Sequence, residues 1–319
     1  MSKKTILILS LTLILLGGIL FAGAMTVLKW DFKMLSTEKY ETSEHTVTEE
    51  FTEILISTDT ARVVLEPSED GRVSVVCHER VKTPHAVSVE NGVLRIELVG
   101  KRKWYEHIGL DLDTPTVTVK IPEGEYGALT LKSNTGKVSV ARGFTFTSAS
   151  VKASTGNVAF AASVGGALTV KASTGDITLE DLSADSLELS VSTGSITVSN
   201  ATVTHDVRLS SSTGKTSLTA LRCRDLVFAG DTGDISLTDV IASGKLTVET
   251  DTGDVRLSRC DAAEIEIETD TGNVTGTLLS EKLFDAKSDT GRVTVPEPVG
   301  TSPCKIRTDT GRIKIEIAN

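Results

Sequence analysis

The sequence is poor in proline and in aromatic residues. Only 7 prolines occur in 319 residues and aromatic residues make up 4%, whereas Gly, Ser, Thr and Val are plentiful. This composition disfavours a helical protein and favours short β-strands joined by tight turns. Apolar residues still account for 39% of the chain, which is enough for a long, thin core.

Motifs for catalysis, metal binding and redox chemistry are also missing. The cysteines form no Cys-x-x-Cys pair and have no metal-ligand spacing with a histidine. Nothing resembles a nucleophile with its base, a phosphate-binding loop or a dinucleotide fingerprint. We therefore predict no enzymatic activity, no catalytic residues and no cofactor, with Ca²⁺ at the aspartates described below as the one alternative. Small core positions are expected for the last two cysteines, and disulfide status stays open for Cys77, Cys223, Cys260 and Cys304.

A net positive charge is absent as well. The formal charge is −10, and residues 1–33 carry +3, so residues 34–319 carry −13. This balance disfavours nucleic acid as a partner. It also predicts repulsion from anionic lipid, unless a local basic patch or a bound cation intervenes.

The longest apolar run lies near the N-terminus, where residues 5–28 contain no charge. At about 1.5 Å per residue, a helix of this length reaches roughly 36 Å, and a hydrocarbon core is about 30 Å thick. We predict a transmembrane helix at 5–28 that places the chain in a cell membrane as a single-pass protein. A cytoplasmic tail at 1–4 then leaves the remainder extracytoplasmic. A signal peptide cleaved after Ala24 is the alternative, and the length of the run favours the anchor.

A turn that ends in Thr-Gly returns ten times. From Thr135 to Thr310 the chain advances 175 residues over nine intervals, or 19.4 residues per repeat. Five turns read Ser-Thr-Gly or Asn-Thr-Gly, and the following five read Asp-Thr-Gly. A constant period of this kind is the signature of a repeat architecture. The turn glycines are Gly136, Gly156, Gly175, Gly194, Gly214, Gly233, Gly253, Gly272, Gly291 and Gly311.

Apolar residues alternate on both sides of each turn, as Leu168 and Val170 do before one turn and Ile177 and Leu179 do after it. A period of two predicts β-strands, so each repeat supplies two short strands and two corners. Equivalent strands then pair in parallel about 4.8 Å apart. The predicted fold class is all-β: a single-stranded parallel β-solenoid with 19 to 20 residues per rung, right-handed by analogy with parallel crossovers. The glycine is expected because the corner needs a positive φ.

The repeat divides the chain into segments. We predict a linker at 29–45, an N-terminal cap with irregular rungs at 46–130, and regular rungs at 131–319. A solenoid needs covered ends, because an exposed rung leaves unpaired N–H and C=O groups. No capping helix follows the strand from Ile313 to Ile317. We therefore predict a bare C-terminal edge at which a second copy could dock.

The second half of the repeat carries an aspartate before each Thr-Gly. Asp-Thr-Gly is also the catalytic triplet of aspartic proteases, but those enzymes use two copies, so we assign the triplet to turn formation. Carboxylates stacked about 4.8 Å apart repel by about 3.5 kcal/mol at an effective dielectric of 20. A solvated column and a Ca²⁺ ladder are the two interpretations open for Asp231, Asp251, Asp270, Asp289 and Asp309.

One basic and aromatic stretch interrupts the acidic remainder of the chain. A loop of this composition could contact an anionic lipid, a glycan or a wall polymer. A solvated loop with one packed tryptophan is the plainer alternative. The nearby histidines have no regular spacing and predict no metal site. The stretch consists of Lys101, Arg102, Lys103, Trp104 and Tyr105.

The serial Ser-Thr-Gly and Asp-Thr-Gly turns, followed by alternating apolar residues and preceded by one hydrophobic span, resemble a known bacterial family. This is the β-strand-repeat family of putative adhesins called domain of unknown function 4097, and the resemblance covers roughly residues 45–317. It implies an exported, envelope-associated β-solenoid, and some members are linked to envelope stress. It supplies no catalytic residues to carry over.

Three functions follow as hypotheses. The leading one is a non-enzymatic, membrane-anchored extracytoplasmic module that binds an envelope protein, a glycan or a second copy, because solenoids offer long repetitive faces. A polysaccharide-active β-helix enzyme is the first alternative, and it would need acids that converge in a groove. A structural spacer or envelope-stress accessory protein is the second.

Overall fold

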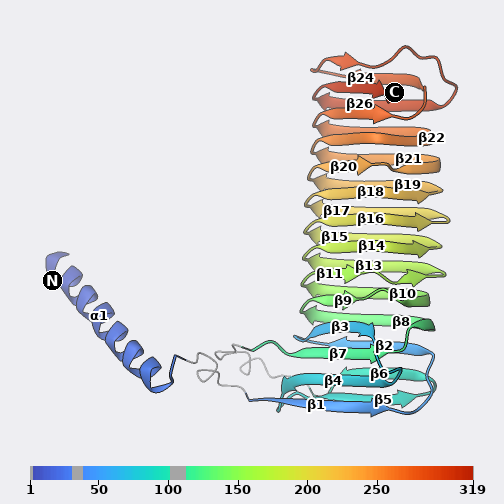
Figure 1. The fold of residues 1–319 in the computed structure, drawn as a ribbon. Helices are drawn as coiled ribbons and strands as arrows, with labels where there is room; N and C mark the ends of the chain where they lie inside the picture. Colours follow the sequence, from blue (N-terminus) through green and yellow to red (C-terminus); the bar gives the residue numbers. More distant parts are fainter. Residues whose placement is uncertain (1–2, 31–38, 101–112, 319) are drawn as a thin grey trace.

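The computed structural model describes residues 3–30, 39–100 and 113–318, which form a helix and a rod of stacked β-strands (Figure 1). The helix, α1 (Lys3–Val27), is long and apolar enough to cross a membrane. Strands β1 to β27 join in a continuous sheet that coils around an apolar core. Both the predicted solenoid and the predicted N-terminal apolar helix are therefore confirmed.

Each regular rung begins with a strand that leads into the Thr-Gly corner, which we call the first side of the rung. Every second residue points into the core, as Leu168 and Val170 do. Equivalent strands pair in parallel, for example Leu168 with Leu187. The regular first-side strands are β8 (Gly124–Thr135), β10 (Phe144–Thr155), β13 (Ala167–Thr174), β15 (Ser186–Thr193), β17 (Asp206–Thr213), β19 (Asp225–Thr232), β21 (Ile241–Thr252) and the C-terminal half of β22 (Val255–Thr271).

After the Thr-Gly corner the chain returns along strands that also face the core with every second residue. Ile177 and Leu179 are fully buried and pair with Ile196 and Val198 of the next rung. The return strands are β9 (Val138–Val140), β11 (Val158–Phe160), β12 (Ser163–Val164), β14 (Ile177–Ala184), β16 (Ile196–Val203), β18 (Thr216–Cys223), β20 (Ile235–Thr238), the N-terminal half of β22 and β23 (Val274–Leu278).

The return strands bend at a third corner, so the prediction of two corners per rung is wrong. In β14 the pairing runs to Glu180 and resumes at Leu182, and the residue between them has a left-handed φ of 52°. Few residues other than glycine adopt this conformation readily. The position has no fixed residue type, which is why the repeat gave no sign of it. Its occupants are Asp181, Asn200, Ala220, Asp239 and Arg259.

The glycines of the Thr-Gly corner stack directly on one another. Eight of the ten have φ between 129° and 155°, but Gly272 and Gly291 do not. A Cβ on any of the ten would lie closer than 3.0 Å to a backbone carbonyl oxygen of the adjacent rung. The predicted need for positive φ therefore holds for most rungs, whereas close backbone approach explains glycine in all of them.

The N-terminal end of the rod departs from chain order. β2 lies between β6 and β8, and β3 lies between β7 and β9, so the earliest rung is one layer inside the end. Antiparallel pairs β1–β4, β4–β7 and β5–β6 complete this end. The strands are β1 (Tyr40–Val47), β2 (Glu53–Thr58), β3 (Arg62–Pro67), β4 (Val73–Arg80), β5 (His85–Glu90), β6 (Val93–Leu98) and β7 (Thr116–Ile121).

The C-terminal end repeats this inversion. β26 pairs with β22 on one side and β24 on the other, while β27 lies between β23 and β25. Figure 1 shows β24 at the far end of the rod, beyond β26. The predicted bare edge at Ile313 to Ile317 is therefore wrong for Ile313 and Lys314, which β25 covers. The elements are β24 (Leu283–Ser288), β25 (Val293–Thr294), β26 (Pro303–Thr310) and β27 (Ile313–Ile317).

Candidate functional site

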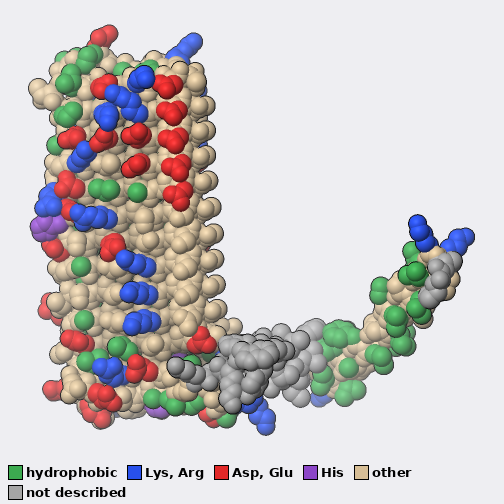
Figure 2. Space-filling model, turned by 180° about the vertical axis from the view of Figure 1, so that it is seen from behind, with side chains coloured by type: hydrophobic (Ala, Val, Ile, Leu, Met, Phe, Trp, Pro, Cys, Tyr) green, Lys and Arg blue, Asp and Glu red, His purple; other side chains and the backbone are tan. Residues whose placement is uncertain are grey.

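The outward side chains of the first-side strands from β8 to β22 form a broad surface that we call the flat face. Because strand residues alternate in direction, equivalent outward residues of successive rungs form columns along the rod. The central column is basic at the N-terminal half, neutral in the middle and acidic toward the C-terminal half (Figure 2). In spatial order it consists of Lys132, Lys152, Lys171, Ser190, Ser210, Ala229, Glu249 and Glu268.

The predicted aspartate column borders the flat face at the Thr-Gly corner. All five side chains are exposed, and Lys287 Nζ lies 2.8 Å from Asp289 Oδ1. The inverted end places Asp309 before Asp289 in space, the reverse of the chain order. Solvent reaches every carboxylate, which relieves their mutual repulsion. Calcium binding at this column stays a prediction.

The flat face is shallowly hollowed on both sides of its neutral middle. One hollow, of about 410 Å³, lies among the lysines of the central column. Another, of about 340 Å³, lies beside Asp231, Glu249 and Asp251. Serine and alanine side chains floor both hollows, because residues this small leave space between longer neighbours.

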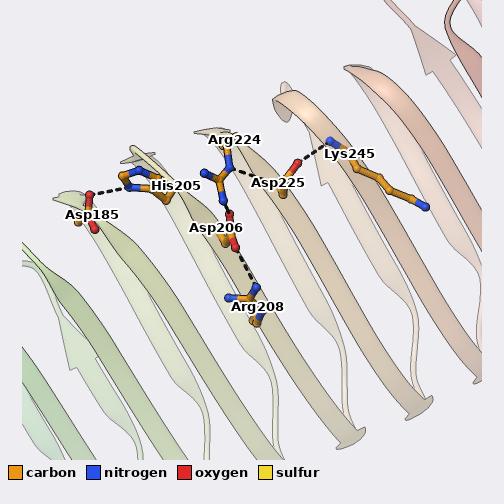
Figure 3. Close-up of polar contacts among 7 residues, drawn as sticks. All are labelled: Asp185, His205, Asp206, Arg208, Arg224, Asp225 and Lys245. Atoms are coloured by element: carbon orange, nitrogen blue, oxygen red, sulfur yellow. Dashed lines mark hydrogen bonds and ion pairs between the residues drawn. The ribbon is translucent and has the colours of Figure 1, made fainter.

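A ladder of polar contacts follows the corner where one rung passes to the first side of the next (Figure 3). His205 Nδ1 lies 2.7 Å from Asp185 Oδ1, and Arg208 donates to Asp206 at 2.8 Å. Arg224 also donates to Asp206, and this contact raises the pKa of the arginine. The ladder ties rungs together with side chains of no common type, so the repeat did not predict it.

A second ion-pair group lies on the acidic half of the flat face. Glu266 accepts hydrogen bonds from Lys245 at 2.7 Å and from Lys305 at 2.8 Å, which lower the pKa of Glu266 from 4.5 to about 2. Three consecutive rungs are joined in this way.

Acid is expected to weaken the rod through this group. The folded-state pKa lies below the unfolded value, so the stabilisation is present above pH 4.5 and is lost as the pH falls toward 2. The side chain of Glu266 is 28% exposed, so we expect only about 1 kcal/mol after solvent screening. Urea titrations of the wild type and Glu266→Gln should differ by this amount at neutral pH and converge in acid. An equal difference at every pH would contradict the assignment.

A buried polar cluster lies in the N-terminal end, which the sequence did not predict. The ligand-type atoms of Cys77, Glu79 and His85 all lie within 4.8 Å of one another, and the three residues are buried. His85 Nδ1 is 2.6 Å from Glu79 Oε2, and its Nε2 is 3.1 Å from Thr58 Oγ1. These residue types can bind zinc, but here the histidine and carboxylate satisfy each other directly. Burial, with a smaller effect of Glu79, raises the pKa of Cys77 to about 12.

All four cysteines are buried and free of disulfide bonds. The predicted core positions of Cys260 and Cys304 are confirmed, with exposures of 0% and 1%. Burial raises the pKa of Cys304 to about 12, so this thiol is not poised to react.

A cleft of about 900 Å³ opens at the N-terminal end of the rod, and we call it the cap cleft. It lies where the loops after β1, β3, β5 and β7 meet. Its floor is apolar and includes Phe51 stacked on Tyr126, with ring centroids 6.1 Å apart and planes 18° apart. The Tyr126 hydroxyl donates to Pro122 O at 2.7 Å, and burial raises its pKa. Polar side chains at the rim are Glu49, Glu50 and Arg72.

Sequence reasoning missed the cap cleft because its residues come from separate loops with no shared spacing. Alternating apolar residues reveal the core, but a single aromatic residue near a strand end, such as Phe51 or Tyr126, does not belong to that pattern. The stretch that the sequence did single out, 101–105, lies outside the described residues. Its contact with lipid or glycan stays a prediction.

Comparisons with known proteins found one family model and several similar solved structures. The family described as Toastrack DUF4097 matches residues 51–212 and 204–319. A putative adhesin from Parabacteroides distasonis is 16% identical over 87% of this chain and 98% of that chain, with a TM-score of 0.48. A putative adhesin from Parabacteroides merdae is 13% identical over 89% and 98%, with a TM-score of 0.45. A putative lipid binding protein from Parabacteroides distasonis is 18% identical over 88% and 98%, with a TM-score of 0.41. No curated protein matches the chain.

Proposed function

The chain belongs to the Toastrack DUF4097 family, and from this premise we propose that it is a non-enzymatic binding module of the cell envelope. α1 anchors the module in the membrane, and the solenoid lies on the extracytoplasmic side. The module binds an envelope glycan in the cap cleft. The span of α1 and the two lysines that precede its apolar run support the anchor and its orientation.

The chemistry of the cap cleft carries this proposal. A sugar ring has an apolar C–H face and hydroxyl groups at its edge. Phe51 and Tyr126 supply an apolar platform for the face, while carboxylates of Glu49 and Glu50 accept hydrogen bonds from hydroxyls and Arg72 donates to ring or carboxylate oxygens. A concave, mostly apolar site with a few polar groups at its rim is the usual form of a ligand site.

The position of the cap cleft also favours binding. Loops carry recognition residues when a rigid scaffold holds them, and here the stacked rungs of the rod are that scaffold. Backbone bonds fix the loops to each other, since Gly127 donates to Thr52 at 2.6 Å and Thr52 donates to Gly92 at 2.9 Å. A cleft held in this way needs little reorganisation to accept a ligand.

The test is co-sedimentation of the detergent-solubilised full chain with purified cell-wall glycan. Phe51→Ala and Arg72→Ala should each weaken binding at least tenfold, about 1.4 kcal/mol, because each removes one part of the site. Leu279→Ala, at a partly exposed apolar residue near the other end of the rod, should bind as the wild type does.

Two outcomes would count against the proposal. Equal binding by all three variants would remove the cap cleft from recognition. Release of new reducing ends from the glycan during the assay would favour the polysaccharide-active alternative over a binding module.

A further inference from the structure

We propose that the flat face is a self-association surface, on which a second copy of this chain packs antiparallel about a two-fold axis between β15 and β17. This interface is separate from the cap cleft and independent of the glycan proposal. A two-fold interface must be complementary to itself, because the same patch is used by both copies. The flat face meets that requirement through the order of charges along its columns.

The geometry follows from the direction of the axis. A two-fold axis parallel to the strands reverses the rod and leaves each column opposite the same column of the second copy. Rungs at equal distances from the axis then meet: β15 faces β17, β13 faces β19, β10 faces β21, and β8 faces β22. Each residue thus has one defined counterpart.

The central column pairs opposite charges in this arrangement. Lys152 faces Glu249 of the second copy, and Lys132 faces Glu268. All four side chains are exposed and available for contact. The lysine-lined hollow of one copy lies over the acidic hollow of the other, so groups of opposite charge face each other there. Each pair occurs twice because of the symmetry.

The column next to the Thr-Gly corner is complementary across the same eight rungs. Its carboxylates on β19, β21 and β22 meet hydrogen-bond donors of the second copy rather than other carboxylates. The counterparts of Asp231, Asp251 and Asp270 are Ser173, Ser154 and Asn134 respectively.

The register is chosen by the pair nearest the axis. Glu188 and Arg208 are neighbours on β15 and β17, so each faces the other type in the second copy. With the axis on β15, Glu188 would face Glu188 of the second copy. With the axis on β17, Arg208 would face Arg208 of the second copy. Like charges directly opposite are unfavourable. Parallel packing is disfavoured for the same reason, since each lysine would meet a lysine.

The side chains near the axis can change partner. Lys171 now lies 2.7 Å from Glu188, and their side chains are 47% and 50% exposed. Arg208 contacts Asp206 at 2.8 Å with its own side chain 64% exposed. Exposed pairs of this kind contribute little within one chain, so exchanging them for pairs across an interface costs little.

The size of the flat face suits a stable pair. Eight rungs about 4.8 Å apart and strands of about 26 Å give roughly 1,000 Å² per copy. Specific interfaces commonly bury about 800 Å² per partner. The surface is polar, so we expect an association that weakens as salt screens its charges.

The experiment measures the mass of the detergent-solubilised full chain by analytical ultracentrifugation. The wild type should be dimeric at about 100 μM and largely monomeric in about 1 M NaCl. Lys152→Glu and Glu249→Lys should each weaken dimerisation at least tenfold, because each creates like-charge contacts. Mixing the two variants should restore a dimer, since every contact between them again joins opposite charges.

Arg222→Glu on a return strand is the matched control and should leave the dimer intact. Thermal unfolding of each variant separates a lost interface from a lost fold. A monomeric wild type, a dimer that survives Lys152→Glu, or two variants that stay monomeric when mixed would each overturn the proposal. Survival of the dimer in that variant would assign self-association to another surface such as α1.

Discussion

Replacing Gly214 with alanine is expected to lower the free energy of unfolding by about 4 kcal/mol, because the new methyl group would overlap backbone and the residue would keep an unfavourable φ. Gly214 has φ 146°, and a Cβ there would lie against the carbonyl group of Gly194 in the adjacent rung. Relief would require the two rungs to separate, which breaks strand pairing on both sides of the corner. Urea-induced unfolding of the full chain in detergent measures the effect.

Two matched variants separate the causes of this loss. Gly71 also has a positive φ, of 71°, but a Cβ there would meet nothing within 4 Å, so Gly71→Ala should cost about 1 kcal/mol from conformation alone. Gly272 lacks a positive φ in that range but has the same close neighbour, Gly253, so Gly272→Ala should cost most of the larger amount. If Gly214→Ala cost no more than Gly71→Ala, rung stacking would not be the reason for glycine.

Replacing His85 with alanine is expected to lower the free energy of unfolding by about 3 kcal/mol, because it leaves Glu79 buried without its main side-chain partner. The side chains of His85 and Glu79 are 2% and 3% exposed, and their facing atoms are 2.6 Å apart. The backbone N–H of residue 85 can still donate to the carboxylate, at 2.7 Å, which limits the loss. Hydrogen exchange should locate the loosened region in β4 and β5.

A solvent-exposed histidine–carboxylate pair elsewhere in the chain provides a control. His205 and Asp185 are 2.7 Å apart, but their side chains are 48% and 45% exposed. His205→Ala should therefore cost less than about 1 kcal/mol. A double variant, Glu79→Leu with His85→Leu, should recover part of the loss, because it removes both buried polar groups together. Equal costs for His85→Ala and His205→Ala would contradict a special role for burial.

The regular body of the rod could be predicted because glycine recurs at the Thr-Gly corner, where the backbone of the adjacent rung leaves no space for a side chain. Gly214 and its equivalents mark the corner, and alternating residues such as Leu168 and Val170 mark the core. The third corner escaped notice because Asp, Asn, Ala and Arg all occupy it. Backbone geometry is fixed there by the corners on either side rather than by the residue itself.

The inverted ends could not be predicted from spacing. Gly291 and Gly311 are separated by the same interval as other turn glycines, so a count of repeats implies simple stacking. Which rung lies outermost depends instead on which strand is better buried. Ile306 and Ile313 are fully buried, whereas their partners in the outermost rung are the smaller Ala286 and Val293, so the more apolar rung lies inside. Comparing the apolar content of the last two repeats would have been the only sign.

Among the candidate surfaces, too, some features could be predicted from the repeat and others could not. The aspartate column that borders the flat face is visible in the repeat, but the group of Lys132, Lys152 and Lys171 is not, because the residue type at that position varies. In later repeats the position holds serine, alanine, glutamate, lysine or arginine. The cap cleft and the buried pair of Glu79 and His85 depend on loops and a hairpin whose contacts no period describes.

The inverted C-terminal end has a consequence for how the protein matures. β26 and β27 follow β24 and β25 in the chain, yet each inserts between two strands that are made before it. A chain still leaving a ribosome or a translocation channel therefore has an open slot where its final strands belong. The slot closes only after β26 and β27 emerge. A product truncated before β26 therefore keeps a gap whose edges have unpaired N–H and C=O groups. Completion of the rod thus requires delivery of β26 and β27.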